Sequence, residues 1–566
     1  MNKRWLTKER PANQQIEELS QAININSLLA SILVQRGITD FETARNFFRP
    51  TLEHLHNPFL MKGMERAVQR LKKAIDSKEK ILIYGDYDVD GTTSVALVYS
   101  YLNKFYHNCE VYIPDRYAEG YGISLAGIEY AEQNNFALII ALDCGIKSAE
   151  LVDLATLKGI DFIICDHHLP DDDIPKAIAV LDPKQENCEY PYQELSGCGL
   201  GFKFMQGFAQ KYRDERELHE YLDLVAVSIA SDIVPITGEN RILAYYGLIK
   251  LNENPSPGLK ALKEIAGIKS DLDISGIVFT LGPRINAAGR VAHALGAVEL
   301  LVSQTELDAN TLAERLNLKN EIRKQFDLDI TGEALTMIEG NEVLRTAKST
   351  VLFKNTWHKG VIGIVAARCV EKYYRPTVIL TESNNKITGS ARSVSGFDLY
   401  SAILECSDLL EKFGGHKYAA GLTLDMNNLE LFQQKFERVV SSTITEAMLT
   451  PVVEIDTPIH FDLIAPKFLN ILKQMAPFGP GNPRPLFEAA NVYVFNSLSS
   501  FKDKHVRFLA KQRNNENIFQ VVGFDMAEYY NQLASGDYFK MAFTIEENTF
   551  NGSTSIQLRI KDIKFL

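Results

Sequence analysis

The chain has 566 residues, too many for a single hydrophobic core, and domains of about 100 to 200 residues would divide it into three or four. Its hydrophobic fraction of 46% and charged fraction of 23% are ordinary for a globular protein and exclude a disordered or fibrous chain. The net charge of −12 argues against nucleic-acid binding through bulk positive charge. A polyanion would have to be held locally, by metal ions or by a basic groove.

The sequence contains no signal for a membrane or for secretion. No apolar run reaches the roughly 20 residues of a membrane span, and the opening MNKRWLTKERPANQQ is charged where a signal peptide would be apolar. We therefore expect a cytoplasmic protein that does not contact a membrane. The seven cysteines are scattered without a CxxC pair, which favours free thiols over a disulfide framework or a zinc site.

The first half of the chain has the pattern of an α/β domain. Residues 1–75 are polar and are expected to form a helical N-terminal segment that leads into the first strand. Short apolar runs then alternate with helix-like stretches, at 81–85, 110–114, 136–142, 161–165 and 177–181. This alternation is typical of a parallel sheet covered by helices on both faces. Helical sequence returns from about 196, so we assign residues 76–300 to one α/β domain.

The second half begins with a long helix. The stretch from Thr305 to Glu339 has no proline and only Gly332 as an interior break, so residues 301–345 are predicted to be a connecting helix. A second α/β domain is expected at 346–450. Short apolar alternations separated by turn residues then predict a small β-barrel at 451–566.

The motif GDYDVDGTTS carries the strongest chemical signal. It places Asp86, Asp88 and Asp90 at alternate positions directly after an apolar strand, where three carboxylates repel one another unless cations lie between them. The carboxyl end of a strand in an open α/β sheet is also where ligands bind. Gly91 allows close backbone approach, and the N-terminus of the helix that follows favours an anion. Taken alone, the motif could also be an exposed acidic turn.

Two further predicted strands end in residue types that bind metals: Asp143 after the run at 136–142, and Asp166, His167 and His168 after the run at 161–165. Asp232 follows an apolar helical stretch and is a fourth candidate, although by itself it could be a residue of a helix end or turn. Carboxylates with one or two imidazoles suit a pair of Mn²⁺ or Mg²⁺ ions better than a thiolate zinc site.

These strand ends and Asp232 resemble the four motifs of the DHH phosphoesterase superfamily. The resemblance implies that two divalent ions, Mn²⁺ or Mg²⁺, are ligated by Asp86, Asp88, Asp90, Asp143, His167 and Asp232. It implies further that Asp143 bridges the ions, that His168 lies by the scissile phosphate and that Asp166 orients an imidazole. Two such ions can stabilise both the incoming and the leaving oxygen of an in-line displacement.

The second α/β domain contains FGGHKYAAGLTL at 413–424, which resembles the GGHxxAAG signature of the DHHA1 domain. Its small residues would let a backbone approach a substrate beside His416, although this histidine could also be packed in a core. Nearby, Ser390 and Arg392 offer a hydroxyl and a guanidinium that together fit a phosphate. An ordinary surface loop is the alternative for these two residues.

Four further features give the whole chain a resemblance to the bacterial RecJ-type exonucleases. They are IPDRYAEGYG at 113–122, GPRINAAGR at 282–290, the polar residues Asn317, Asn320 and Arg323 of the long helix, and the C-terminal barrel. There are two departures: Asp115 stands where asparagine is more common, and the Asp232 motif reads SIASD where GTVAD is usual. The expected architecture is thus a DHH domain at 76–300, a connecting helix at 301–345, a DHHA1 domain at 346–450 and an oligonucleotide-binding barrel at 451–566.

The resemblance implies a single-stranded-DNA-specific 5′-to-3′ exonuclease that releases 5′-mononucleotides in recombination and DNA repair. The terminal phosphate would be read by Ser390 and Arg392, helped by Arg116, Arg284 or Arg290. In the barrel, a basic and aromatic cluster that includes Lys504 and Arg507 would bind the strand, unless it is only a solvated strand face. The barrel could close the cleft between the lobes into a ring that excludes duplex. We expect a monomer, with a helicase and a single-strand-binding protein as the partners that supply its substrate.

Two other functions are compatible with the same motifs. One is a DHH phosphodiesterase that acts on short oligoribonucleotides or cyclic dinucleotides, which the chain length and the barrel disfavour. The other is a non-enzymatic binding protein that has kept the fold, which the presence of every expected ligand disfavours.

Overall fold

The computed structural model describes residues 3–550 and 552–565, and the chain forms two compact units. The first, called here the barrel unit, consists of Met1–Leu55, Pro235–Tyr245 and Val452–Leu566. The second, the two-sheet unit, consists of His56–Val234 and Tyr246–Pro451. Among the described residues, no helix combines the length and the apolar character that a bilayer crossing requires.

The first sheet of the two-sheet unit is parallel and has five strands in the order β3-β2-β4-β5-β6. The strands are β2 (Ile81–Gly85), β3 (Cys109–Tyr112), β4 (Leu138–Leu142), β5 (Asp161–Cys165) and β6 (Ala179–Leu181). Every residue of β2 and β4 is buried, which explains their unbroken apolar sequence. The predicted parallel sheet is therefore confirmed, and the carboxyl ends of β2, β4 and β5 lie side by side.

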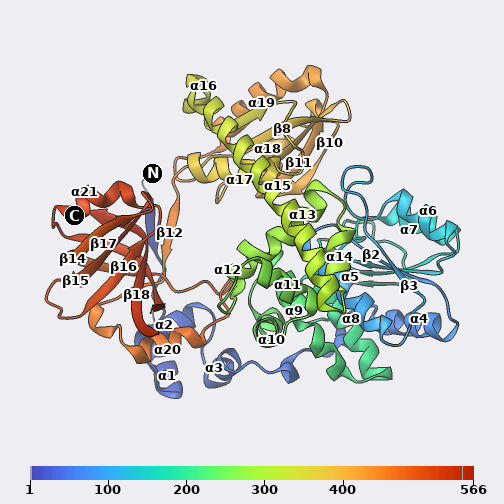
Figure 1. Cartoon of the computed structure of the whole chain (residues 1–566), viewed down its shortest axis with the longest axis horizontal. Helices are drawn as coiled ribbons and strands as arrows, with labels where there is room; N and C mark the ends of the chain where they lie inside the picture. Colours follow the sequence, from blue (N-terminus) through green and yellow to red (C-terminus); the bar gives the residue numbers. More distant parts are fainter. Residues whose placement is uncertain (1–2, 551, 566) are drawn as a thin grey trace. The chain divides into compact units, whose positions relative to one another are not determined.

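Helices cover the first sheet: α4 (Met64–Asp76), α5 (Val89–Asn103), α6 (Leu125–Gln133), α7 (Ala149–Leu157), α8 (Gly197–Tyr212) and α9 (Leu222–Ser231). The α5 helix packs against both α8 and α9, so the N-terminal end of α8 and the C-terminal end of α9 come close to the strand ends (Figure 1). Further helices follow: α10 (Gly238–Glu253), α11 (Pro257–Ile265), α12 (Ile274–Gly276), the π-helix η4 (Ile277–Leu281), α13 (Gly282–Val291) and α14 (Leu295–Leu301).

The long helix α15 spans Glu306–Glu339, as the sequence predicts. The Thr305 side chain caps it by accepting a hydrogen bond from the backbone N–H of Asp308. One part of α15 packs against α11, α13 and α14, and another against α17 (Ile362–Tyr373), so the helix joins both lobes of this unit (Figure 1). The short α16 (Glu342–Thr346) follows.

The second sheet has the order β10-β11-β9-β8-β7, with β7 (Thr350–Phe353), β8 (Thr377–Ser383), β9 (Lys386–Arg392), β10 (Lys412–His416) and β11 (Ala419–Leu424). Alternate residues of β8 point to opposite faces: Ile379 packs with α15 and α17, whereas Val378 packs in the core that contains residues of α18 (Leu399–Leu404) and α19 (Leu429–Thr443). Ser390 and Arg392 lie on β9 between β8 and β11, so they are not in a surface loop.

The C-terminal strands form a closed barrel: β14 (Phe487–Phe501), β15 (His505–Gln512), β16 (Ile518–Gly523), β18 (Ser553–Phe565) and β17 (Phe539–Phe550). Closure comes from β14, which pairs with β17 as well as with β15. The predicted barrel is therefore confirmed. Smaller elements of the same unit are β12 (Val452–Ile455), β13 (Thr457–Pro458), α20 (Pro466–Gln474) and α21 (Tyr530–Ala534).

The N-terminal segment differs from the expectation of a purely helical lead into the first strand. It begins with a strand, β1 (Arg4–Thr7), that pairs in parallel with β12. The helices α1 (Asn13–Ile23), α2 (Ser27–Gln35) and α3 (Phe41–Phe48) belong to the barrel unit, because their apolar residues, such as Leu29 and Leu33, share its core. Only α4 leads into β2. A strand of four residues is too short to show an alternation of apolar and polar residues, and its partner is distant in the sequence, so the sequence alone does not predict it.

Candidate active site

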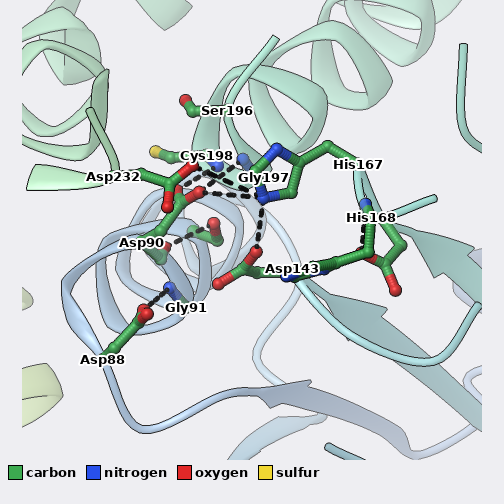
Figure 2. Close-up of polar contacts among 12 residues, drawn as sticks. Asp88, Asp90, Gly91, Asp143, His167, His168, Ser196, Gly197, Cys198 and Asp232 are labelled. Atoms are coloured by element: carbon green, nitrogen blue, oxygen red, sulfur yellow. Dashed lines mark hydrogen bonds and ion pairs between the residues drawn. The ribbon is translucent and has the colours of Figure 1, made fainter. Parts of the chain in front are cut away.

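The acidic and histidine residues at the strand ends converge on one imidazole nitrogen (Figure 2). His167 Nε2 lies 3.2 Å from Asp143 Oδ1, 3.6 Å from Asp232 Oδ2 and 3.7 Å from Asp90 Oδ2. The strands β4 and β5 deliver Asp143 and His167, α5 carries Asp90 in its first turn, and Asp232 follows the last residue of α9. Residues far apart in the sequence thus meet at the sheet edge where ligands bind.

Asp90 is fixed by the N-terminus of α8. Its Oδ2 accepts a hydrogen bond of 2.7 Å from the Gly197 N–H, and its Oδ1 accepts one of 2.8 Å from the Cys198 N–H and one of 2.6 Å from the Ser228 hydroxyl. A β-carbon on Gly197 would lie 2.6 Å from Asp143 Cβ, so only glycine fits there. Gly197 and Ser228 were not among the predicted site residues, and no local pattern marks them, because they act on a residue distant in the chain.

Other carboxylates of the site are buried without compensation. Asp86 is fully buried, and no described side chain donates a hydrogen bond to its oxygens; the backbone groups of Tyr87 and Gly122 lower its pKa, but by less than burial raises it. Asp143 Oδ1 is equally buried and, apart from the nearby His167 ring, has no partner in the described chain. Asp88 caps α5 by accepting a hydrogen bond from the Gly91 N–H. Unpaired buried carboxylates are costly unless a cation or a proton neutralises them.

The pKa shifts of the cluster also indicate carboxylates that need a neutralising cation or proton. Burial, followed by repulsion from neighbouring carboxylates, raises the pKa of Asp86 and Asp143 well above the ordinary range and that of Asp232 to about 8. Burial lowers the pKa of His167, which favours the neutral imidazole that ligates cations. Both effects are those of a site that divalent cations would neutralise.

Two sets of side chains are close enough to hold cations: Asp90 with His167 and Asp232, and Asp143 with His167 and His168. Within each set the ligand atoms lie within 4.8 Å of one another. Their oxygen and imidazole donors, with the unpartnered oxygens of Asp86 and Asp143, fit Mn²⁺ or Mg²⁺. Among the sequence-predicted ligands, Asp86 and Asp88 fall outside both sets but repel the others electrostatically.

His168 is oriented from behind by Asp166. Asp166 Oδ1 lies 2.7 Å from His168 Nδ1 and also accepts from the His168 backbone N–H, while its Oδ2 accepts from the Ile146 N–H. Burial alone would lower the pKa of His168, but the bond to Asp166 and the surrounding carboxylates outweigh it and raise that pKa. The Tyr121 hydroxyl lies 3.2 Å from the other ring nitrogen, Nε2. Tyr121 was not among the predicted site residues, although it lies in the segment at 113–122.

A pocket of about 420 Å³ contains four of the predicted phosphate-binding residues: Arg116, Arg290, Ser390 and Arg392. Tyr87 also lines it and stands between Asp86 and Asp88 in the sequence, so the pocket adjoins the carboxylate cluster. An Arg392 guanidinium nitrogen donates a 3.1 Å hydrogen bond to the Ser390 hydroxyl. Within the described part of the chain, the lining residues include no aspartate or glutamate.

The cations of this pocket repel one another. Burial first, and then Arg116 and Arg392, lower the pKa of Arg290 to about 10. Burial and Arg116 likewise lower the pKa of Arg392 and of Lys359, which also lines the pocket. Three guanidinium groups and two ammonium groups, those of Lys359 and Lys412, with no carboxylate in the described lining, form a site that a bound anion would stabilise.

Two predicted substrate-binding residues lie elsewhere. Arg284 donates to Asn317 Oδ1 on α15 and to the Thr280 carbonyl, at 3.0 and 2.8 Å, and does not line the pocket. Arg284 and Arg290 are on different faces of α13, because a separation of six residues is not a whole number of helical turns. His416 ends the edge strand β10 and is exposed, so it is not packed in a core. It does not line the pocket, but it lies within electrostatic range of His168, whose charge adds to burial in lowering the pKa of His416.

The basic cluster of the barrel lies on the β14–β15 hairpin. Lys504 and Arg507 are both exposed, and Arg507 donates a 3.1 Å hydrogen bond to the Ser499 hydroxyl while its guanidinium lies 6.0 Å from the Phe501 ring. Arg507 and Phe508 also line a groove of about 490 Å³ on this unit. Exposed cations beside an aromatic ring can contact a single strand.

Known families match three segments of the chain. The DHH family N-terminal domain matches residues 80–229, the DHHA1 domain residues 346–442 and the RecJ OB domain residues 455–562. Among curated proteins, the single-stranded-DNA-specific exonuclease RecJ of Bacillus subtilis (strain 168) is 35% identical over 98% of this chain and 70% of its own length. The protein of the same name from Escherichia coli (strain K12) is 31% identical over 89% of this chain and 90% of its own.

Solved structures agree on the fold. RecJ from Thermus thermophilus in complex with Mn²⁺ matches 99% of this chain and 79% of its own, with a TM-score of 0.84 and 24% identity. The exonuclease RecJ bound to manganese matches 70% of this chain and 98% of its own, with a TM-score of 0.61 and 28% identity. The ordered DHH, DHHA1 and OB segments and the near-complete match to curated relatives lead to one conclusion: the chain belongs to the RecJ family of DHH proteins.

Proposed function

We propose that this chain is a metal-dependent exonuclease specific for single-stranded DNA, which removes 5′-mononucleotides from the 5′ end. The proposal rests on two unlike sites that adjoin: a buried cluster of carboxylates and imidazoles, and a pocket lined by cations. Tyr87 lines the pocket and stands between Asp86 and Asp88 in the sequence. The curated relatives named RecJ are single-stranded-DNA-specific exonucleases.

Six residues would hold the two divalent ions: Asp86, Asp88, Asp90, Asp143, His167 and Asp232. His167 belongs to both sets, and Asp143 lies 3.2 Å from its Nε2. Asp143 is also repelled by the other four carboxylates, which supports it as the bridging ligand. When bound, Mn²⁺ or Mg²⁺ supplies Lewis-acid stabilisation of the phosphate and a lowered pKa for water. Two solved RecJ structures from Thermus thermophilus are complexes with these two metals.

His168 and Asp166 would act at the scissile phosphate. Asp166 accepts a hydrogen bond from His168 Nδ1–H and stays ionised, because hydrogen bonds from His168 and Ile146 lower its pKa despite burial. The raised pKa of His168 favours the protonated ring, whose Nε2 N–H can donate to a phosphate oxygen. Tyr121, at 3.2 Å from the same nitrogen, limits the rotation of the ring.

The direction of degradation would come from the cation-lined pocket. A terminal 5′ phosphate held by Ser390, Arg392, Arg116 and Arg290 would leave the next phosphodiester at the adjoining carboxylate cluster. The fixed separation of the two sites would then set a step of one nucleotide.

The rest of the strand would bind the barrel, through Lys504 and Arg507. We propose further that the protein is a cytoplasmic monomer, and that a helicase and a single-strand-binding protein supply its substrate during recombination and repair.

The deciding experiment is digestion of 5′-phosphorylated single-stranded DNA carrying a 3′ label, with Mn²⁺ and with EDTA. Progressive shortening without early release of the label, and only with metal, supports the proposal. Faster hydrolysis of a cyclic dinucleotide or of short RNA than of the DNA strand would favour the other phosphodiesterase class, and early release of the label would reverse the polarity.

A further inference from the structure

A second, smaller pocket of about 140 Å³ lies beside the cation-lined pocket. Its polar lining residues are Ser231, Asn286, Arg290 and Arg323, and the others are apolar side chains, glycine and proline. No carboxylate belongs to its lining among the residues that the structure describes. Arg290 lines both pockets, and Ser231 directly precedes Asp232, so the small pocket adjoins both the terminal-phosphate site and the carboxylate cluster.

Two donors in this pocket are buried and unsatisfied. Arg323 is only 9% exposed, and its Nε has no hydrogen-bond partner among the described residues. The Ser231 hydroxyl is likewise buried and unpartnered in the described chain. A buried donor without an acceptor costs roughly 1 to 3 kcal/mol, so both groups favour a ligand that brings acceptor oxygens.

The side chain of Arg323 is held in place by other residues of its own helix, α15. Its Nη2 donates a 2.9 Å hydrogen bond to Asn320 Oδ1, and its Nη1 lies 3.6 Å from Asp327 Oδ2. Asp327 is itself occupied by Arg368, whose Nε and Nη2 each donate a 2.9 Å bond to its carboxylate. The guanidinium of Arg323 is therefore anchored, while the charge of Asp327 is already satisfied by another arginine.

We propose that this pocket binds the phosphate that follows the scissile one, as the third phosphate of a 5′-phosphorylated strand. This inference rests on the proposed function. The terminal phosphate occupies the larger pocket, the scissile phosphate lies at the carboxylate cluster, and the next one accepts from Arg323, Ser231 and the shared Arg290. Two guanidinium groups and a hydroxyl, with no carboxylate in the described lining, suit the anionic oxygens of a phosphodiester.

The consequence is a minimum substrate length. A 5′-phosphorylated dinucleotide has only a terminal and a scissile phosphate, so it leaves the small pocket empty. A trinucleotide fills it. The Arg323 site thus selects strands over dinucleotides at the catalytic lobe itself, before any contact with the barrel.

The test compares Arg323→Met with the wild type on a 5′-phosphorylated dinucleotide and trinucleotide. Because a charge-assisted contact is lost, kcat/KM on the trinucleotide is expected to fall roughly tenfold to a hundredfold, with less than about a twofold change on the dinucleotide. Arg323→Lys, which keeps the charge, is expected to recover part of the loss. In EDTA, the affinity advantage of the trinucleotide over the dinucleotide should disappear in Arg323→Met.

Arg368→Gln is the matched control, because it removes the stronger partner of Asp327 but no lining residue of the pocket. If Arg323 only stabilises α15, Arg323→Met and Arg368→Gln will both lower the melting temperature and will slow both substrates equally, which overturns the inference. Equal trinucleotide and dinucleotide kinetics in the wild type mean that the pocket holds only water, and also overturn it. Failure of the wild type to hydrolyse any DNA strand would instead refute the proposed function.

Discussion

At the scale of single residues, the site combines carboxylates and guanidinium groups that lack partners of opposite charge. Asp86 and Asp143 are buried acids without adequate partners, whereas Arg290 and Arg392 are half-buried cations repelled by Arg116. Each group is destabilising alone, and each becomes favourable with a ligand of opposite sign. The carboxylate cluster would therefore favour metal ions, and the cation-lined pocket would favour phosphate.

Replacement of Asp143 by alanine tests the carboxylate cluster. Because this carboxylate lies at the centre of the cluster, Asp143→Ala should abolish hydrolysis, and because it removes an uncompensated buried charge, the variant should melt at the same or a higher temperature in EDTA. Asp182→Asn, a buried acid outside both metal sets, is the control and should stay active. Turnover above about a tenth of the wild-type rate would contradict the bridging role.

Replacement of Arg392 by alanine tests the cation-lined pocket. The variant should lose roughly ten- to a hundredfold in kcat/KM on 5′-phosphorylated strands and far less on strands with a 5′-hydroxyl, because only the former present the anion. Arg284→Ala removes a guanidinium of the same unit that lies outside the pocket, and should not discriminate between the two ends. Equal losses on both termini in Arg392→Ala would mean that the terminal phosphate binds elsewhere.

At the scale of elements, the ends of helices fix the positions of the acidic residues at the strand ends. The N-terminus of α8 donates two backbone N–H groups to Asp90, and α5 begins at the acidic motif itself. The approach of α8 to β4 is so close that a β-carbon on Gly197 would lie 2.8 Å from Asp143 Oδ1. Metal affinity therefore depends on a backbone position as well as on the ligands.

Gly197→Ala should weaken metal binding without removing any ligand. The added methyl group displaces Asp143 or α8, so the Mn²⁺ concentration that gives half-maximal activity should rise by about tenfold or more. Gly332→Ala on α15, where the added atom meets nothing within 4 Å, is the control and should leave the Mn²⁺ requirement unchanged while raising stability by about 0.5–1 kcal/mol. An unchanged Mn²⁺ requirement in Gly197→Ala would show that α8 can move to accommodate the methyl group without disturbing the metal ligands.

The elements also show what the sequence could and could not predict. Buried parallel strands and α15 have strong local signals, so their ranges and the strand-end carboxylates were predictable. Arg116, Arg290, Ser390 and Arg392, which were predicted to bind phosphate, line one pocket, whereas Arg284 lies outside it, because the orientation of α13 is set by packing and not by composition. Tyr121, Ser228 and the pocket at Arg323 depend on contacts between distant segments, which have no periodic signature.

At the scale of the whole molecule, the barrel is inseparable from the start of the chain. Helices α1 to α3 share its core, and strand β1 pairs with β12 in a separate two-stranded sheet, so removal of residues 451–566 would leave Leu29 and Leu33 without their packing partners. Truncation therefore tests folding as much as binding. Changes of the exposed side chains on the β14–β15 hairpin separate the two effects, because the neighbouring core residues Val506 and Phe508 stay in place.

The last prediction concerns Lys504 and Arg507, changed together to alanine. Both side chains are exposed, so the barrel should stay folded, and the loss of two phosphate contacts should lower the slope of log affinity against log salt by about 0.7 for each contact. KM on long strands should rise, while kcat and the rate on a 5′-phosphorylated trinucleotide should hardly change, because a trinucleotide is too short to need the barrel. Lys467→Ala with Lys473→Ala, on the helix α20 of the same unit, matches the change in net charge away from the hairpin. An unchanged salt slope in the hairpin variant, or an equal change in both variants, would show that these cations act only through the overall charge of the unit.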